Sequence, residues 1–323
     1  MKKLIIFISF SLYFLPIIAQ TERQLTVSEI RQQTQIDEPI TLQKGYCRFG
    51  SGFNYSFSSI DEFDNNWKKK TNYYSSNNNS FAFPFNFRYG VTNKFEIDLS
   101  TVYKNRTSDS GNKIENNISH ETKYSNTKVI KKGFADLHIS AIYKLLEEKP
   151  RVPSIGLSTT LDVPYGKRET TYSSDSLTLY PNTTDGYYSL GAIVLIKKTF
   201  YPFAIENGLV YKYNFPVDVK LPYDSEKTDV KQGNLFIIDF TFHYMPCDWI
   251  DLANAFEFVS AAPNKYSSSK YDFMVMNRNI FSWLPQLSLQ IKNLRLTQMF
   301  NFTIGAKNWS TTPAYMLILE LKI

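Results

Sequence analysis

The sequence predicts an all-β fold: a transmembrane antiparallel up-and-down β-barrel of about twelve strands. Three observations predict it. Apolar and polar residues alternate in segment after segment from residue 44 onward, the connections between these segments alternate between short and long, and aromatic residues make up 16% of the chain. A barrel in lipid combines an apolar outer face, aromatic girdles and a polar interior, which yields this mixture of residues.

The alternation is clearest in the segment 93–104. There Phe95, Ile97 and Leu99 alternate with Glu96 and Asp98. A period of two places the two sets on opposite faces of a strand. The same pattern recurs in twelve segments, at roughly 44–59, 80–90, 93–104, 133–146, 152–163, 186–198, 201–214, 232–245, 249–260, 276–291, 294–304 and 313–323.

The connections support the same architecture. Five are short, and six are longer and rich in Asn, Ser, Thr, Asp and Lys, at about 60–79, 105–132, 164–185, 215–231, 261–275 and 305–312. Short periplasmic turns and long extracellular loops are typical of transmembrane barrels. Fourteen strands are an alternative if 105–132 or 164–185 contains a hairpin. Pro84 and Pro285 lie inside expected strands, where proline removes a ladder hydrogen bond, so we expect a bulge or kink at each.

The N-terminus predicts three parts of the chain. Residues 1–19 are typical of a signal peptide, because Lys2 and Lys3 precede an apolar run and cleavage is expected between Ala19 and Gln20. The run of about 15 residues is shorter than the roughly 20 that a spanning helix needs. Residues 20–43 are expected to form a periplasmic N-terminal arm, and 44–323 the barrel. The sequence leaves open whether the arm plugs the lumen.

The last segment, 315–323, alternates up to the C-terminal Ile323. This resembles the C-terminal signal that the outer-membrane insertion machinery binds, although many such signals end in Phe. The expected partners are therefore this machinery, outer-membrane lipid and lipopolysaccharide, and a small solute. The formal charge of +6 is small and dispersed, so nucleic acid is not an expected partner.

If the apolar rows face lipid, the other face of each strand lines the lumen. The charged lumen-lining candidates are Arg88, Glu96, Asp98, Asp136, His138, Lys144, Asp162, Glu206, Lys212, Asp239, His243, Glu257 and Arg295. In one interpretation they pair across the lumen and keep the barrel rigid or shut. In the other they line a solute path and set its selectivity.

The sequence predicts no catalytic site, metal site or cofactor. A lipid-modifying barrel enzyme needs a nucleophile and a base within hydrogen-bond reach on the lipid-facing side. His138 and His243 are instead expected to face the lumen, and His120 lies in an expected loop. No glycine loop for phosphate and no metal-ligand spacing such as HExxH occurs. Cys47 and Cys247 lie in segments that are not neighbours, so we expect free thiols.

Several short motifs resemble a known family. They are RYGVTNKFEI at 88–97, GFADL at 133–137, IYKLL at 142–146 and LDVPYG at 161–166. They resemble strand and turn motifs of the outer-membrane transporter family named for the MetA pathway of phenol degradation, with Tyr165 in place of the usual Thr. The resemblance spans roughly residues 80–323 and implies a barrel that passes small hydrophobic or aromatic compounds. Gly90 and Gly166 are expected at turns where φ is positive, and Asp136 near the outer rim.

The expected function is therefore that of a porin-like channel or transporter of the Gram-negative outer membrane, through which small hydrophobic or aromatic solutes pass by passive diffusion. Three alternatives stay open. They are a structural or adhesion barrel that transports nothing, a lipid-modifying enzyme of the outer membrane, and a soluble periplasmic β-sandwich.

Overall fold

The computed structural model describes residues 40–56, 61–63, 66–68, 77–115, 122–166, 171–172, 178–180, 186–220, 227–266, 277–311 and 313–323. The expected signal peptide, its cleavage site and the arm up to residue 39 lie outside these residues. Within the described ranges, no helix has the length and apolar character needed to cross a membrane.

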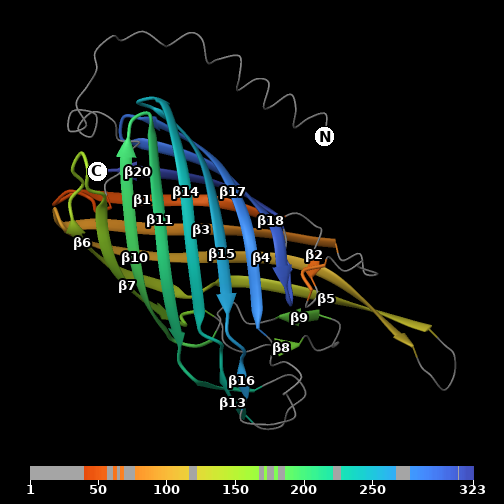
Figure 1. Ribbon diagram of the computed structural model, residues 1–323. Helices are drawn as coiled ribbons and strands as arrows, with labels where there is room; N and C mark the ends of the chain where they lie inside the picture. The colour runs from red at the N-terminus through yellow and green to blue at the C-terminus, as the bar shows by residue number, and fades with distance from the viewer. Residues whose placement is uncertain are drawn as a thin grey trace, which may run out of the picture.

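Twelve strands form a closed antiparallel barrel (Figure 1). In order around the barrel they are β1 (Cys47–Ser56), β3 (Asn77–Thr92), β4 (Phe95–Glu115), β6 (Leu137–Leu146), β7 (Ser154–Val163), β10 (Ser189–Phe200), β11 (Phe203–Asn214), β14 (Leu235–Cys247), β15 (Ile250–Ala261), β17 (Arg278–Ile291), β18 (Leu294–Lys307) and β20 (Ala314–Lys322). Each strand pairs with the next, and β20 pairs with β1 to close the sheet. The predicted all-β barrel of twelve strands is confirmed.

Both ends of the described chain lie at one end of the barrel. The backbone groups of Cys47 and Ile323 exchange two hydrogen bonds of 2.8 Å, which join the first and last strands. The connections β3–β4, β6–β7, β10–β11, β14–β15 and β17–β18 are short and lie at this same end. We call it the short-turn end and the opposite one the long-loop end. The predicted alternation of short and long connections is thereby confirmed.

The two faces of the barrel differ as the period of two predicts. Outward residues such as Leu190 and Leu319 are 50% and 48% exposed, whereas inward Glu96 and Ser189 are fully buried. Aromatic rings on the outer face pack across neighbouring strands, as in the pair Phe203–Tyr244, whose ring centroids are 5.3 Å apart. Such cross-strand pairs stabilise a sheet by about 0.2–1 kcal/mol each.

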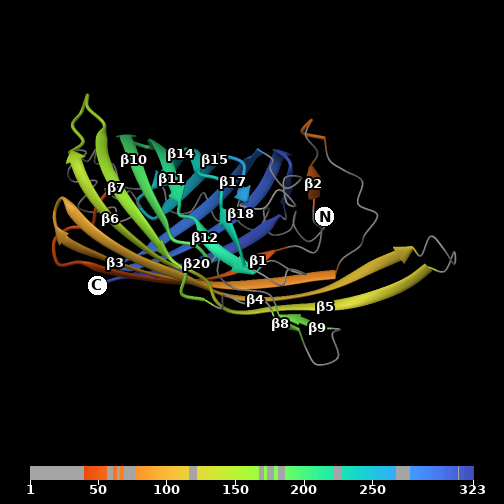
Figure 2. The ribbon, with the colours of Figure 1, turned by 90° about the horizontal axis from the view of Figure 1, so that it is seen from below.

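The connection 105–132 contains a hairpin, which the sequence left open as an alternative to a loop. β4 continues to Glu115 and pairs with β5 (Thr122–Phe134), so that the two strands project beyond the barrel as a long hairpin (Figure 2). β5 and β6 pair in succession with β4, so the hairpin lengthens one barrel strand and the barrel keeps twelve. Asp136 lies in the break between β5 and β6. The sequence favoured a loop over a hairpin here because the segment is polar and carries no apolar row.

The other long connections also contain short strands. β2 (Asp61–Phe63) pairs with β19 (Trp309–Thr311), and β8 (Thr171–Tyr172) with β9 (Thr178–Tyr180), which extends the sheet beside β5. β12 (Val217–Lys220), β13 (Lys227–Lys231) and β16 (Lys265–Tyr266) form a separate sheet at the long-loop end. None of these strands belongs to the barrel wall.

The two strand prolines each interrupt one ladder. Pro84 pairs with Val102 of β4, but two residue pairs at Pro84 are missing between β1 and β3. Two pairs are likewise missing between β17 and β18 at Pro285. Because the register is the same on both sides of each gap, the expected bulge is absent. Proline has no N–H to donate, which accounts for the missing pairs.

Candidate functional site: the barrel lumen

Residues 40–43, which we call the inner segment, lie inside the barrel at the short-turn end. Thr41 and Leu42 are 1% and 3% exposed. The Leu42 N–H donates to a Glu96 carboxylate oxygen at 2.5 Å. Two strands further around the wall from β4, a Cβ on Gly156 of β7 would lie 2.6 Å from the Ile40 side chain. The inner segment therefore reaches from the β3–β4 hairpin to β7.

Gly90 is where the inner segment meets the wall. A Cβ on Gly90 would lie 2.1 Å from the Gln43 carbonyl oxygen. The expectation of a positive φ at Gly90 and Gly166 was wrong, because the glycines with positive φ among the described residues are Gly45, Gly133 and Gly186. Gly90 is required by close backbone approach rather than by its own conformation.

Glu96 anchors the inner segment and is itself held by a cation. The Arg88 Nε lies 2.6 Å from a Glu96 carboxylate oxygen, and Glu96 is fully buried. A buried carboxylate is tolerated only when it is paired and hydrogen-bonded, and Glu96 satisfies both conditions. Arg88 and Glu96, both predicted to line the lumen, are thus brought together.

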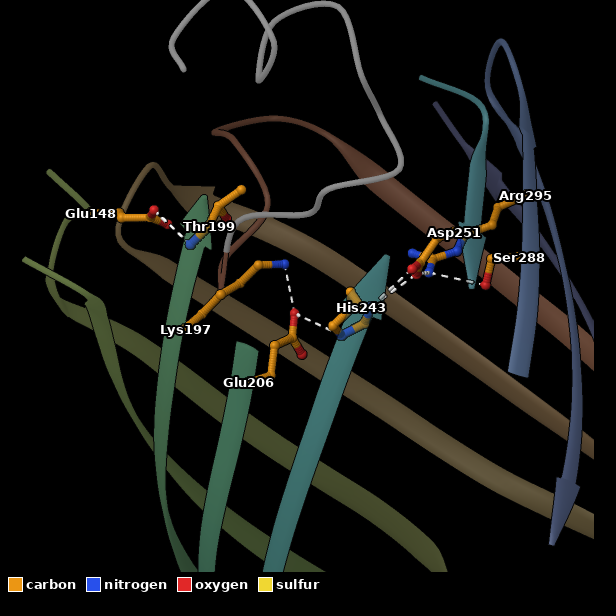
Figure 3. Close-up of polar contacts among 8 residues, drawn as sticks. All are labelled: Glu148, Lys197, Thr199, Glu206, His243, Asp251, Ser288 and Arg295. Carbon is orange, nitrogen blue, oxygen red and sulfur yellow. Dashed lines mark hydrogen bonds and ion pairs between the residues drawn. The ribbon is translucent and has the colours of Figure 1, made fainter. Parts of the chain in front are cut away.

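A chain of polar contacts crosses six strands near the short-turn end (Figure 3). It consists of Lys197, Glu206, His243, Asp251, Ser288 and Arg295, which we call the short-turn network. A Glu206 oxygen lies 2.6 Å from Lys197 Nζ and 3.7 Å from His243 Nε2. His243 Nδ1 lies 3.0 Å from Asp251, and Arg295 lies 3.8 Å from the same carboxylate. Arg295 also donates to the Ser288 hydroxyl at 3.3 Å.

The β6–β7 turn folds over the end of β10. The Glu148 carboxylate accepts a hydrogen bond of 2.8 Å from the Thr199 N–H (Figure 3), beyond the last residue pair of β10 with β7. In the β10–β11 turn, burial and then the Asp248 carboxylate raise the pKa of the Tyr201 phenol, so this phenol stays neutral at pH 7. The Glu148–Thr199 contact therefore fixes the β6–β7 turn against the end of β10.

A second polar cluster lies toward the long-loop end. The Asp162 carboxylate pairs with His138 Nδ1 and with Lys212, and it accepts a hydrogen bond from the Ser189 hydroxyl. Ser140 lies on the same strand face as His138, with its hydroxyl 3.1 Å from His138 Nε2. Three of the predicted lumen residues, His138, Asp162 and Lys212, thus link strands β6, β7 and β11.

Ser140 contacts His138 and His138 contacts Asp162, which is the sequence of contacts found in a serine hydrolase triad. The surroundings do not suit that chemistry. Ser140 is 5% exposed and lies directly opposite Asp98 on β4, whose negative charge opposes a developing oxyanion. The strand around Ser140 pairs with β4 on one side and β7 on the other, so its N–H groups are used in the sheet. We interpret the cluster as structural.

The lumen also has an apolar surface that the sequence reasoning missed. Five β-branched aliphatic side chains on inward positions are paired from strand to strand across β10, β11, β14, β15 and β17. They are Ile193, Val210, Ile237, Val259 and Ile280, which we call the aliphatic strip. The signal was present, because strict alternation fails in runs such as Ala192–Ile196, and such runs place apolar residues on both faces.

Between the aliphatic strip and the inner segment lies a lumen cavity of about 490 Å³. It is bordered by Ile40, by Lys197, Glu206, His243 and Arg295 of the short-turn network, by Arg88, and by Asp239 and Glu257. A volume of this order is typical of small-molecule sites. A second hollow of about 540 Å³ lies on the outer face, where Ser51 and Thr101 stand among large residues such as Phe49, Phe85 and Leu319.

Most of the predicted lumen residues fall into these groups. Lys144 is 8% exposed and lies 3.4 Å from Glu147 of the β6–β7 turn. Asp98 shares the inward face of β4 with Glu96. In the described part of the chain, no group of three or more His, Cys, Asp or Glu side chains is placed to bind a metal ion. Cys47 and Cys247 are both free thiols.

Comparison with known proteins reveals a likeness of fold. No protein-family model matches the chain, and no curated protein sequence matches it either. The COG4313 outer membrane channel from Pseudomonas putida F1 superimposes with a TM-score of 0.64 at 12% identity, over 88% of this chain and 97% of that one. The Ralstonia pickettii toluene transporter TbuX gives 0.43 at 10% identity, over 87% and 90%. The first likeness shows the fold of this chain, an antiparallel barrel of the kind found in an outer membrane channel.

Proposed function

We propose that the chain is a bacterial outer-membrane channel through which small, largely apolar solutes diffuse passively. Its closed barrel with an apolar outer face suits a bilayer, because closure pairs each wall strand with two neighbours and leaves no open sheet edge, the gaps at Pro84 and Pro285 apart. The predicted signal peptide at 1–19 and the alternating C-terminal segment 315–323 support the proposal of export and insertion by the outer-membrane machinery.

The aliphatic strip carries the proposal. A lumen that serves only water and ions is polar, and nothing in barrel closure requires five aliphatic side chains on the inward face. Four of them, Ile193, Val210, Ile237 and Ile280, remain partly exposed inside the barrel. Apolar surface removed from water contributes about 25 cal/mol per Å², so an apolar solute that contacts the strip is favoured over a polar one of equal size. The lumen cavity argues against a purely structural barrel with a packed interior.

The proposal is tested by swelling of liposomes that contain the full mature chain. We expect faster entry of phenyl glucoside than its size alone allows, relative to glucose. The double variant Ile237→Asn/Val259→Asn is expected to lower this ratio about threefold, because the strip loses apolar contact. Ile142→Asn, an inward aliphatic change on the facing wall, is the matched control and leaves the ratio unchanged. Entry of both sugars at the rate of protein-free liposomes would overturn the proposal.

A further inference from the structure

Two carboxylates in the lumen face each other without a counter-charge. Asp239 of β14 and Glu257 of β15 are directly opposite on the inward face, and both border the lumen cavity. Among the described residues neither has a hydrogen-bond or ion-pair partner, and the charge that acts on Glu257 is that of Asp239. Like charges directly opposite on a sheet are destabilising. We call these two residues the acid pair.

The cations that border the cavity do not balance the acid pair, because each is matched by another carboxylate. Arg88 pairs with Glu96. Lys197 pairs with Glu206, and Arg295 lies beside Asp251. Among the residues that the structure describes, the cavity and the ion-pair partners of its cations named above therefore hold three cations and five carboxylates, a formal excess of two negative charges. This excess of negative charge attracts a cationic ligand electrostatically.

A buried acceptor points to the same kind of ligand. His243 is 8% exposed, and its Nδ1 faces Asp251, which fixes the ring proton there. The opposite nitrogen, Nε2, has no hydrogen-bond partner and borders the cavity. The charge nearest to Nε2 is a Glu206 oxygen at 3.7 Å, which is also an acceptor. Since Glu206 is already paired with Lys197, a ligand that brings its own N–H donor would supply the partner that Nε2 of a neutral ring lacks.

The apolar surface begins next to the acid pair. Ile237 precedes Asp239 by two residues on β14, and Val259 follows Glu257 by two on β15, so the side chains share the inward face. Residues two apart on a strand are about 7 Å apart. A ligand that spans both surfaces therefore needs a charged end and an apolar body joined by only a few bonds.

We propose that the lumen binds small organic cations, with a primary ammonium group at the acid pair, which borders the lumen cavity, and an apolar body on the adjoining aliphatic strip. This assigns a solute class to the channel and rests on the proposed function. A neutral solute of the same shape contacts the strip but leaves the two carboxylates unbalanced. An inorganic cation balances the carboxylates but gains nothing from the strip.

The test uses the full mature chain in planar lipid bilayers with potassium chloride. Block of the potassium current is measured with 2-phenylethylammonium, with 2-phenylethanol and with ammonium chloride. We expect 2-phenylethylammonium to block at a concentration about tenfold lower than either of the other two, since charge-assisted hydrogen bonds and apolar contact act together only in this probe. Asp239→Asn/Glu257→Gln is expected to raise its half-blocking concentration about tenfold. Asp218→Asn, an exposed change in β12 that removes a charge of the same type, is the matched control.

The outcomes separate the two proposals. Equal half-blocking concentrations for all three probes would overturn the organic-cation site but not the proposed channel. So would a double variant whose half-blocking concentration for 2-phenylethylammonium equals that of the wild type. Block by ammonium chloride as strong as by 2-phenylethylammonium makes the acid pair a site for simple cations, which also overturns the inference. Absence of any current and of any sugar entry overturns the proposed function itself.

Discussion

The Leu42 N–H donates a hydrogen bond of 2.5 Å to the carboxylate of Glu96, a residue 54 positions further along the chain. This contact fixes the inner segment inside the short-turn end of the barrel. Because Arg88 of β3 holds the same carboxylate, one buried ion pair links β3, β4 and the inner segment.

Replacement of Glu96 by Ala is expected to release the inner segment. The Leu42 N–H and the Arg88 guanidinium both lose their partner, and removal of one member of a buried ion pair typically costs about 3–5 kcal/mol. We expect single-channel conductance in planar bilayers to rise about twofold or more as residues 40–43 leave the lumen. Glu320→Ala, an inward carboxylate on β20, is the control. An unchanged conductance in a folded Glu96→Ala barrel would contradict this role of the inner segment.

Gly90→Ala tests the close approach between the wall and the inner segment. The added Cβ meets the Gln43 carbonyl oxygen at 2.1 Å, and backbone must shift to make room. Overpacking of this kind costs about 1–3 kcal/mol. We expect the temperature at which the folded band converts to the unfolded one in gel electrophoresis to fall. Gly305→Ala, where the new Cβ would have ordinary contact with Trp67 at 3.4 Å, provides the comparison, and an equal shift in both variants would sink the argument.

Asp251 is the central residue of the short-turn network, and its side chain is 2% exposed. Asp251→Asn removes the charge that faces His243 and Arg295, and we expect a loss of about 3–5 kcal/mol in unfolding free energy. Urea unfolding in detergent micelles, followed by tryptophan fluorescence, measures it. Asp248→Asn at the exposed β14–β15 turn makes the same chemical change and is expected to have little effect. Equal midpoints for the two variants would show that the network is not stabilising.

Ser140 tests the enzyme alternative. Since it is buried, faces Asp98 and has no free N–H groups around it, we expect no labelling of the wild-type protein by a fluorophosphonate probe. Ser140→Ala is expected to leave channel properties unchanged. Labelling of the wild type that disappears in Ser140→Ala would establish a reactive serine and revive the hydrolase interpretation.

The sequence predicted the barrel wall well, because the alternation of apolar and polar residues within each strand indicates which face meets lipid. The outward-facing residues Phe95, Ile97 and Leu99 can be recognised in the sequence without knowledge of any partner strand. The β4–β5 hairpin could be given only as an alternative, because a polar hairpin has no apolar row. Contacts such as Leu42–Glu96 could not be predicted, since they depend on where a polar segment outside the alternation comes to lie.

In the lumen, too, single residues could be predicted from the sequence but their contacts could not. The charged candidates were identified one by one from their register, but their grouping depends on strand pairing. His138 and Asp162 are joined because β6 and β7 are neighbours, and His243 and Asp251 because β14 and β15 are. The only sign of the aliphatic strip in the sequence is a local failure of alternation. Strict alternation, on which the prediction of the strands was based, does not identify such inward-facing apolar residues.

The central claim, that this chain is an outer-membrane β-barrel, is tested most directly by heat modifiability of the mature protein from the outer-membrane fraction. Closed barrels of this type stay folded in cold detergent. The account predicts that the unheated protein migrates faster in gel electrophoresis than the boiled protein, and that both come from the outer membrane. A protein that shows no shift and is recovered from the periplasm without detergent would contradict the barrel, and the channel would fall with it.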